Sequence, residues 1–506
     1  MKRAILFAIL AVSSLNIQAQ FSGKGSGTAT DPFQITDADE LFEVRNSLSA
    51  YYRLMNDVDL TAWIKENNPR QGWSPIGTSG APFKGNFDGN NHAIINLTLL
   101  RPEDDNIGFF GYIETASIHH VAFINPMLNG NDNVGIIGYA NMSDITNITV
   151  HGESVTGHSN IGGICGYCIN DNNKKRELSS CYCSADINSS LRYAAGIVGY
   201  VRLNICVQFN RYDGRVVGNQ YSAGIVGYAS SKNGYSNDTM RENFVSGSIY
   251  GEGYGTSTTV GGSNLYGISR SYSLQDTLFC RDQEVSHYIY SLNADDLNIF
   301  ENCRKVENRD AVTRYGTFYP REQFYKKRFY FISFTLNDGT RYDFDKIFSI
   351  IEDSVAPYNI LQTRPVSNVS FWEGSKSTIS GHGLNGNTIY VLVGDKVLTT
   401  KVTDGVWTIN LGMIKSGTEA RIFSHADGML PSIITKVTAC SEPEKVIHGD
   451  ANGDGKIDTA DVVATINYIL GKQSLGFSIT NADITGDGII LVDDVAIIVQ
   501  LILDNQ

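Results

Sequence analysis

Five short cores of the form Gly-x-x-Gly-Tyr recur along the middle of this 506-residue chain, and they constrain its fold most strongly. The intervals between successive cores are nearly equal, apart from a longer third one, and a second short apolar run follows each of the first four cores. A unit of two or three short strands cannot bury its apolar face alone, whereas stacked units can. The pattern therefore predicts a parallel β-helix with columns of Ile, Val and Phe inside. The cores are Gly108–Tyr112, Gly135–Tyr139, Gly163–Tyr167, Gly196–Tyr200 and Gly224–Tyr228.

These cores resemble the GLUG repeat, which is known from bacterial surface and secreted proteins. The segment Phe83–Ile94 is similar to the stretch that commonly precedes such repeats, so the resemblance covers about residues 30–270. Just inside this region, Asp37–Glu40 has the form of a helix capping box, followed by apolar residues on one helical face. We expect a GLUG-type β-solenoid whose first coil is closed by a short helix. The resemblance indicates a fold rather than an activity.

Two acidic twelve-residue loops near the C-terminal end have the spacing of calcium ligands. The first loop begins at Asp450 and the second at Asp483, and each loop runs directly into an apolar helix. In the first loop, positions 1, 3, 5, 9 and 12 have oxygen-bearing side chains, position 6 is glycine, and position 7 would contribute its carbonyl. The predicted Ca²⁺ ligands are Asp450, Asn452, Asp454, Lys456, Asp458 and Asp461 in loop 1, and Asp483, Thr485, Asp487, Ile489 and Asp494 in loop 2.

The second loop departs from this pattern at two positions. Thr485 stands where Asn or Asp is usual, and Leu491 cannot supply a side-chain oxygen at position 9. Because the number of charged ligands sets calcium affinity, we expect two sites, of which the second is weaker.

The duplicated loop–helix unit resembles the type I dockerin family over about residues 447–506. Two features fit the family: position 12 of each loop is Asp rather than Glu, and we expect no helix entering either loop. The resemblance implies a non-catalytic module that binds calcium, folds around it and docks to a cohesin module of a partner protein. In the family, loop positions 10 and 11 dominate partner choice. Here these positions are Thr459, Ala460, Val492 and Asp493.

The two copies differ at these partner-binding positions. Asp493 would bury an unpaired carboxylate against a surface shaped for Ala460, which is costly. We therefore expect one preferred binding mode, through the helix that begins at Thr459. The alternative is a calcium-stabilised cap without any cohesin partner.

The N-terminal segment and the charge distribution indicate export. A charged start, the apolar run Ala4–Leu15 and a small residue at position 19 are typical of a signal peptide, and no other stretch is long enough to span a membrane. Net charge is −13, but residues 447–506, with nine Asp and two Lys, contribute −7 of it. The acidity therefore belongs mostly to the calcium module, and we expect a secreted or surface-associated protein without nucleic-acid partners.

The remaining segments are less specific. Residues 304–331 mix basic and aromatic side chains, which suits plain strands first, a glycan platform second and nucleic acid last. The strand Gly405–Leu411 and its neighbours resemble bacterial immunoglobulin-like modules. We thus expect a mainly β chain with five parts: a signal peptide (1–19), the solenoid with its cap (20–270), an unassigned β-rich region (271–356), an Ig-like β-sandwich with a linker (357–445) and the small α-helical dockerin (446–506).

The eight cysteines leave three interpretations open. Cys165 falls in a column with Phe110 and Val198, and Cys181 in a column with Val121, so buried apolar thiols are favoured. A disulfide between Cys181 and Cys206, or a zinc site that includes Cys168 and Cys183, are the alternatives.

Catalytic motifs are absent from the sequence. No His-Glu-x-x-His motif, Gly-x-Ser-x-Gly elbow or phosphate loop occurs, which argues against a metallopeptidase. The acidic residues of the repeats occupy non-matching positions and are interpreted as solvated loop residues: Asp144, Glu153, Asp171, Asp186 and Asp213. We therefore favour a non-catalytic binding or scaffold protein that presents the solenoid to glycans or a host surface. The alternative is a dockerin-bearing β-helix enzyme, a glycoside hydrolase or polysaccharide lyase in polysaccharide breakdown.

Overall fold

The computed structural model describes residues 21–252, apart from 173, 203 and 231–239, then short strands between 260 and 351. It further describes 355–441 without 395, and 447–472 and 476–504. The predicted signal peptide and most of the basic and aromatic segment lie outside the described residues. Contacts divide the chain into two units, a large unit ending at Ala439 and a small unit that begins mainly at Cys440.

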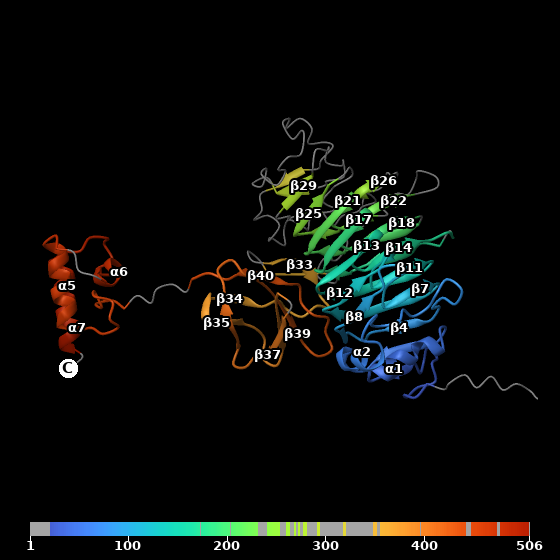
Figure 1. The fold of residues 1–506 in the computed structure, drawn as a ribbon, viewed down its shortest axis with the longest axis horizontal. Coiled ribbons are helices and arrows are strands. Elements are labelled where there is room, and N and C mark those ends of the chain that lie inside the picture. The colour runs from blue at the N-terminus through green and yellow to red at the C-terminus, as the bar shows by residue number, and fades with distance from the viewer. Residues whose placement is uncertain are drawn as a thin grey trace, which may run out of the picture. The chain divides into compact units, whose positions relative to one another are not determined.

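The large unit contains a stack of short parallel strands that form three sheets (Figure 1). The repeated Gly-x-x-Gly-Tyr cores predict such a stack. Sheet 1 consists of β1 (Phe33–Ile35), β2 (Tyr51–Leu54), β3 (Val58–Asp59), β4 (Asn86–Asp88), β5 (Ala93–Ile95), β8 (Ser117–Ile124), β12 (Asp144–His151), β15 (Arg176–Ser179), β16 (Tyr182–Cys183), β19 (Ile205–Gln208), β20 (Arg211–Tyr212), β23 (Met240–Arg241), β24 (Phe244–Val245), β27 (Ile268–Ser269) and β28 (Tyr272–Ser273).

Two further sheets complete each coil. Sheet 2 consists of β6 (Thr98–Leu100), β9 (Met127–Asn129), β10 (Asp132–Val134), β13 (Ser154–Gly162), β17 (Asp186–Ala195), β21 (Arg215–Ala223), β25 (Ser248–Gly251) and β29 (Thr277–Cys280). Sheet 3 consists of β7 (Phe110–Glu114), β11 (Ile137–Asn141), β14 (Cys165–Ile169), β18 (Val198–Arg202), β22 (Val226–Ser230) and β26 (Val260–Ser263). The β-solenoid prediction is confirmed, and its parallel pairing continues beyond residue 270, since β29 pairs with β25.

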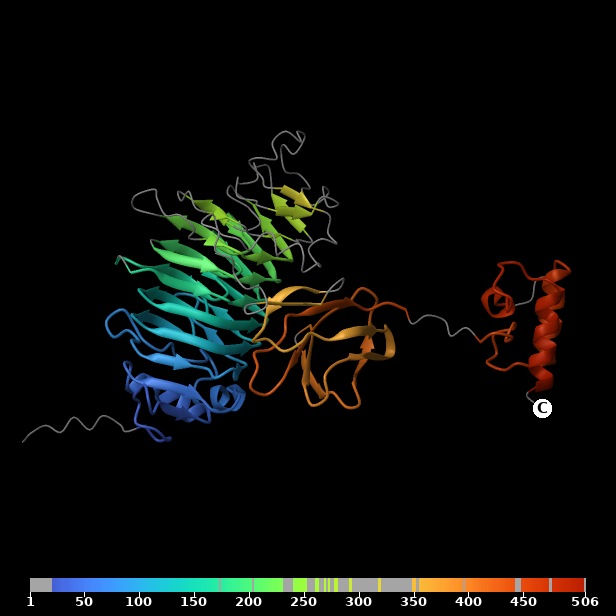
Figure 2. The ribbon, with the colours of Figure 1, turned by 180° about the vertical axis from the view of Figure 1, so that it is seen from behind.

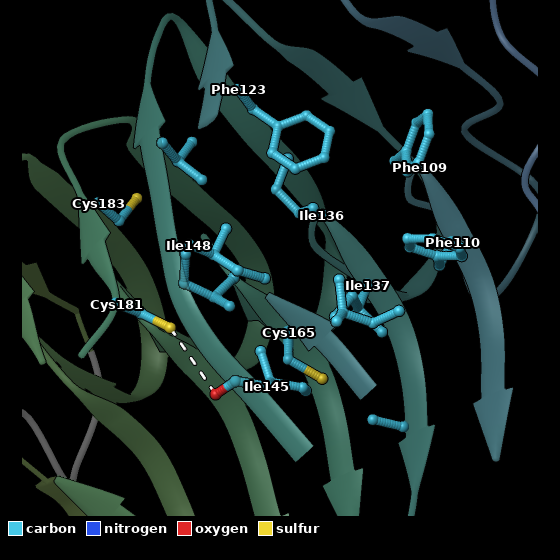
Figure 3. Packing of buried hydrophobic residues seen from close by; sticks show 14 of the residues in the cluster. Phe109, Phe110, Phe123, Ile136, Ile137, Ile145, Ile148, Cys165, Cys181 and Cys183 are labelled. Carbon is cyan, nitrogen blue, oxygen red and sulfur yellow. Dashed lines mark hydrogen bonds between the residues drawn. The ribbon is translucent and has the colours of Figure 1, made fainter. Parts of the chain in front are cut away.

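The repeat cores supply the inner column of sheet 3. Phe110, Ile137, Cys165, Val198 and Val226 pair in register on successive coils, and all five are buried. Figure 3 shows part of this core, with the side chains pointing inward. The core glycines allow the coils to approach, because a Cβ added at the second core's first glycine would lie 2.6 Å from a backbone oxygen of the next coil.

An asparagine ladder fixes one corner of the coil. Asn106, Asn133 and Asn160 have φ angles of 58°, 61° and 60°, in the left-handed region that Asn tolerates. Each side-chain amide donates to the one before it, at 2.9 Å and 2.8 Å. The ladder satisfies the polar side chains at this turn, which the Gly-x-x-Gly-Tyr pattern does not predict.

A short helix covers the first coils. Helix α1 (Ala38–Glu43) begins after Asp37, whose carboxylate accepts hydrogen bonds from the N–H groups of Asp39 and Glu40. It continues as a 3₁₀ turn, η1 (Val44–Asn46), and Leu41 is buried in the solenoid core. A second helix, α2 (Thr61–Asn67), follows. The N-cap was predicted correctly, although the Glu40 carboxylate accepts from Thr36 rather than completing the box.

Two antiparallel sheets follow the solenoid and share one core around Trp407. The three-stranded sheet has the order β34 (Ser367–Phe371), β35 (Gly374–His382), β38 (Val406–Ile414). The four-stranded sheet has the order β37 (Lys396–Lys401), β36 (Thr388–Val393), β39 (Glu419–His425), β40 (Thr435–Thr438). A small sandwich is therefore present, and its immunoglobulin-like character stays a prediction. Two strand pairs lie between solenoid and sandwich along the chain: β30 (Ser291–Asn293) with β31 (Thr317–Tyr319), and β32 (Phe348–Ile351) with β33 (Val355–Asn359).

The small unit contains two main helices and a single-turn helix, visible at the C-terminal end in Figure 2. These are α5 (Thr459–Ile469), α6 (Ile479–Ala482) and α7 (Val492–Asp504). The prediction that no helix enters either loop is wrong for the second loop, because α6 ends directly before Asp483. Ser478 is the N-cap of α6, and its hydroxyl oxygen accepts a hydrogen bond from the N–H of Asn481. This hydrogen bond stabilises the start of the helical turn. No helix among the described residues is long and apolar enough to cross a membrane.

Candidate metal centre and docking surface

The two acidic loops of the small unit adopt the same hydrogen-bonded form. The position 1 carboxylates accept from the backbone, Asp450 from Gly455 N–H and Asp483 from Gly488 N–H, both at 2.9 Å. This bond curls each loop back over its first residue. The turn requires a positive φ at the glycine of position 6, and φ is 84° at Gly455 and 81° at Gly488. The prediction that glycine makes the sharp turn at position 6 is thus confirmed.

The position 12 carboxylates close each loop in the same way. Asp461 accepts from Asn452 N–H at 3.0 Å and from Asp458 N–H at 2.8 Å. Asp494 accepts from Thr485 N–H at 3.1 Å and from Leu491 N–H at 2.9 Å. Equivalent donors at the same offsets in both copies indicate one structural unit repeated.

The other predicted ligands also lie in the two loops. Lys456 and Ile489, expected to bind through their carbonyls, donate their N–H groups to Asp454 and Asp487 at 2.9 Å and 2.8 Å. Asp458 caps α5 and accepts from Ala460 N–H at 2.7 Å. Position 9 of loop 2 has no such cap, since its side chain is leucine.

The electrostatic setting of the two position 12 carboxyls differs. Burial raises the pKa of the Asp461 carboxyl, and the carboxylates of Asp450 and Asp454 raise it further, against hydrogen bonds that lower it. Burial also acts to raise the pKa of Asp494, but hydrogen bonds from Leu491 and Thr485 outweigh it and leave that pKa lowered. The carboxylates of loop 1 therefore repel one another more strongly than those of loop 2. A cation bound in loop 1 would neutralise this negative charge.

The donor set fits a hard cation. Asp450, Asp461 and Asp494 are at most 2% exposed, and none pairs with a basic side chain among the described residues of this unit. Buried carboxylates without a counter-ion are costly, and Ca²⁺ prefers oxygen ligands of this kind.

The second half of the unit packs onto the first loop. Asn481 donates from its amide to the carbonyl of Asp450 at 2.9 Å and accepts from the N–H of Ile447 at 3.1 Å. The small core contains Ala464, Ala482 and Ile498. Such a core is small for a free-standing module, so we expect the ion to contribute to folding.

Both helices have an exposed stripe that begins at the predicted partner-binding residues. Thr459, Ala460, Val492 and Asp493 are all exposed. On α5 the stripe continues with Val463, Ile466 and Leu470, which are 57%, 40% and 64% exposed. On α7 the equivalent residues are Ala496, Val499 and Leu503. Exposed apolar side chains at i, i+3, i+4 and i+7 mark a helix face that another protein can cover.

The loops and helices together define a duplicated calcium-loop module of the docking type. Residues 448–503 match the family described as the dockerin type I domain, and this part of the chain is a type I dockerin. Dockerins of this type are known to bind calcium and to dock to cohesin modules, typically in extracellular or cell-surface proteins.

Two other proteins are similar over short segments. A protein of Evansella cellulosilytica with the provisional name Gly-rich membrane protein is 37% identical over 114 residues, 22% of this chain and 13% of that protein. Halomucin of Haloquadratum walsbyi is 33% identical over 114 residues, 21% of this chain and 1% of that protein. The chain thus spans a small fraction of the length of these relatives.

A ladder of tyrosines runs along the outer face of sheet 3. Tyr112, Tyr139, Tyr167, Tyr200 and Tyr228 stack in order, with ring centroids 4.5, 5.0, 4.8 and 5.5 Å apart. All five are half-buried. Because the ring faces cover one another, the ladder offers ring edges and hydroxyl groups to solvent rather than open aromatic faces.

The solenoid thiols are buried in the core. Cys165, Cys181 and Cys183 are at most 1% exposed, and burial raises the pKa of the latter two to about 12. The Cys181 thiol lies 4.0 Å from the carbonyl of Ile145 (Figure 3). No described group of three metal-ligand atoms within 4.8 Å includes a cysteine, so the zinc interpretation has no support. The thiols are buried, and burial favours their protonated form.

The predicted column that joined Cys181 to Cys206 is wrong. Cys206 pairs in register with Glu177, which lies earlier in the same coil than Cys181. Tyr182 pairs with Arg211, so the column of Cys181 continues at Asn210, and the apolar run beginning at Leu203 lies too early in the chain to continue it. The two cysteines form no disulfide in the structure.

Three of the repeat carboxylates that were predicted to be solvated form ion pairs with arginines, and one of the three is also buried. Asp144 pairs with Arg176 at 2.8 Å, and Asp186 pairs with Arg421 at 3.1 Å. The third, Asp213, is 4% exposed and pairs with Arg211 at 2.9 Å. Spacing along the chain could not reveal the partners of the first two, which come from a neighbouring coil and from the sandwich.

Proposed function

We propose that the protein is an exported, non-catalytic binding protein, attached to a larger assembly through its dockerin and presenting its solenoid to a ligand. The observation that carries this proposal is the dockerin with its exposed apolar stripe beside a calcium loop. A stripe of this kind on a folded module needs a partner to cover it. The signal peptide predicted at residues 1–19 would bring the chain to the compartment where calcium is plentiful.

Docking is proposed to use the α5 face. The α5 stripe has Val463 and Ile466 where α7 has Ala496 and Val499, so it offers more apolar surface. Loop 1 also has the complete ligand set and a capped helix start. A more rigid helix loses less conformational entropy on binding, which favours this face.

The solenoid is proposed to bind a glycan along the tyrosine ladder. The steps of about 5 Å between rings repeat along the stack, and Tyr200 already donates to the Ser230 hydroxyl at 3.0 Å. A row of phenol hydroxyls offers both donors and acceptors, which suits the hydroxyl groups of an extended polysaccharide. Hydrogen bonding, rather than stacking on open ring faces, would carry recognition.

The rival proposal is a β-helix glycoside hydrolase or polysaccharide lyase. Such enzymes place two carboxylates, or a carboxylate and a base, on one coil face. Three of the five candidate acids are instead neutralised by arginines, which supports the binding proposal. A screen of the protein against plant and host glycans, scored for retention and for product release, separates the two.

The screen has a matched pair of variants. Tyr167→Phe keeps the stack but removes one hydroxyl together with its hydrogen bond to Arg202, so it should weaken retention several-fold and lower thermal stability only slightly. Tyr51→Phe, on an exposed tyrosine of sheet 1, serves as the control. Reproducible release of oligosaccharide by the wild-type protein would overturn the non-catalytic proposal.

A further inference from the structure

Two adjacent histidines on the solenoid face outward together, which a regular strand would not allow. In β8 the side chains of Ile118 and Val121 are buried, while His119 and His120 between them are half-buried on the outer side. His120 has φ = 54°, in the left-handed region. This turn breaks the alternation of the strand, so neighbouring residues point the same way. The next coil has Thr146 and Asn147 at the same place.

The turn brings three potential ligand atoms together. The Nδ1 atoms of His119 and His120 lie 2.8 Å apart, and Nδ1 of His119 lies 3.5 Å from Oδ1 of Asp88 on the preceding coil. Among the described residues, this is the one group whose three ligand atoms lie within 4.8 Å of one another. The group lies in the solenoid, outside the dockerin.

The chemical types of the three side chains suit a metal. A neutral imidazole has one nitrogen lone pair to donate. Two imidazoles and a carboxylate form a donor set for a divalent transition metal rather than for calcium.

We propose that Asp88, His119 and His120 bind a divalent transition metal ion, with Zn²⁺ as the reference ion, through Oδ1 and the two Nδ1 atoms. Zinc–nitrogen bonds of about 2.0–2.1 Å at a tetrahedral angle place two nitrogens about 3.3 Å apart, so the rings separate by about half an ångström on binding. Three protein ligands leave at least one position open to water or to a group of a bound ligand.

Side-chain amides lie where the remaining ring nitrogens need partners. The amide of Asn86 is 3.1 Å from Nε2 of His119, and the amide of Asn147 is 3.4 Å from Nε2 of His120. When Nδ1 binds a metal, Nε2 carries the hydrogen and needs an acceptor. A half-turn of each amide supplies its oxygen, and for Asn147 this gives up a 3.1 Å bond from Asn359.

One charge opposes the ion. Arg53, half-exposed, donates to Oδ2 of Asp88 at 2.9 Å. Its positive charge lies close to the proposed ion and reduces the affinity. Arg53→Gln should therefore tighten zinc binding by about tenfold. A purely structural histidine pair would show no such gain.

The test is the amount of zinc bound by the full-length protein. The protein is dialysed against micromolar Zn²⁺ in excess calcium, which occupies the oxygen-rich dockerin loops, and bound zinc is measured by mass spectrometry. We expect one zinc per wild-type chain, and its loss in His119→Ala. His120→Asn should lose it too, and this variant folds because Asn suits the left-handed turn.

A matched control removes a histidine elsewhere. His158, half-exposed and beside Asp132 at 3.2 Å, is a surface histidine with one carboxylate neighbour, so His158→Ala should keep the zinc. Replacing zinc with Co²⁺ should give visible absorption bands typical of nitrogen and oxygen ligands, absent in His119→Ala. A wild-type protein without zinc, or unchanged zinc in both folded variants, would overturn the proposal and leave the close contact between the two Nδ1 atoms as a hydrogen bond between neutral rings.

Discussion

The imidazole of His151 lies flat on the phenyl ring of Phe423, with ring centroids 4.0 Å apart and planes 4° from parallel. His151 belongs to β12 of the solenoid and Phe423 to β39 of the sandwich. Tyr390 stacks on the same phenyl ring at 4.8 Å, and Arg421 pairs with Asp186 of the solenoid. These contacts join solenoid and sandwich within the large unit, so the sandwich is more than a spacer on a flexible tether.

The burial of His151 makes the free energy of unfolding depend on pH. Burial lowers the pKa of His151 to about 3, from an ordinary value of 6.5. The unfolded chain therefore binds a proton below pH 6.5 that the folded protein excludes, and stability is lost as pH falls. The contribution is complete above 6.5 and declines by up to about 1.4 kcal/mol per pH unit below it. Urea unfolding at pH 7.5, 6.5 and 5.5 measures the decline.

His151→Phe is the matched variant for this pH effect, because it keeps a ring against Phe423 but cannot be protonated. The difference in unfolding free energy between wild type and variant should shrink or reverse as pH falls. A difference that stays constant from pH 7.5 to 5.5 would show that His151 does not titrate on unfolding.

The solenoid thiols are expected to act only through packing. Cys165→Ala leaves a small cavity and should lower the unfolding free energy by about 1–2 kcal/mol. Cys165→Val should cost less, because Val198 and Val226 fill the same place on later coils. Chemical denaturation under reducing conditions measures both. Equal losses for the two substitutions would mean that the cavity is not the cause.

The two calcium loops are expected to contribute unequally to folding of the dockerin. Asp450→Ala removes a position 1 ligand from the loop with the complete set, so it should abolish most of the helical signal gained on calcium titration. Asp483→Ala, the matched change in loop 2, should reduce this gain far less. The measurement is far-ultraviolet circular dichroism during titration, and equal effects would show that the loops are misranked.

The sequence predicted the features whose cause is local and repeated. The column from Phe110 to Val226 followed from the Gly-x-x-Gly spacing, and the N-cap at Asp37 and the glycine turns followed from single residues. The hydrogen-bonded form of the two acidic loops was predictable because its offsets are fixed within one short loop. Each of these features depends on neighbours along the chain or on strict periodicity.

Features that depend on the other coils were not predictable. The pairing of Asp186 with Arg421, the stacking of His151 on Phe423 and the outward turn at His120 arise from partners or backbone angles without a sequence signature. The register of Cys206 was not predictable either, because two apolar runs can be paired at several offsets and only the partner strand shows that Cys206 lies beside Glu177. A shift in register moves every side chain of a strand to a new partner.

The central claim is calcium-dependent docking through the first dockerin helix, and retention of an extracellular partner by the full-length protein tests it most directly. The protein, immobilised in calcium or in chelator, is presented with the secreted and surface proteins of its own source, and retained proteins are identified. We expect a cohesin-bearing protein to be retained only with calcium. Ala460→Asp should remove it, whereas Asp493→Ala should leave retention near the wild-type level. Retention that is independent of calcium, or weakened alike by both substitutions, would contradict the account.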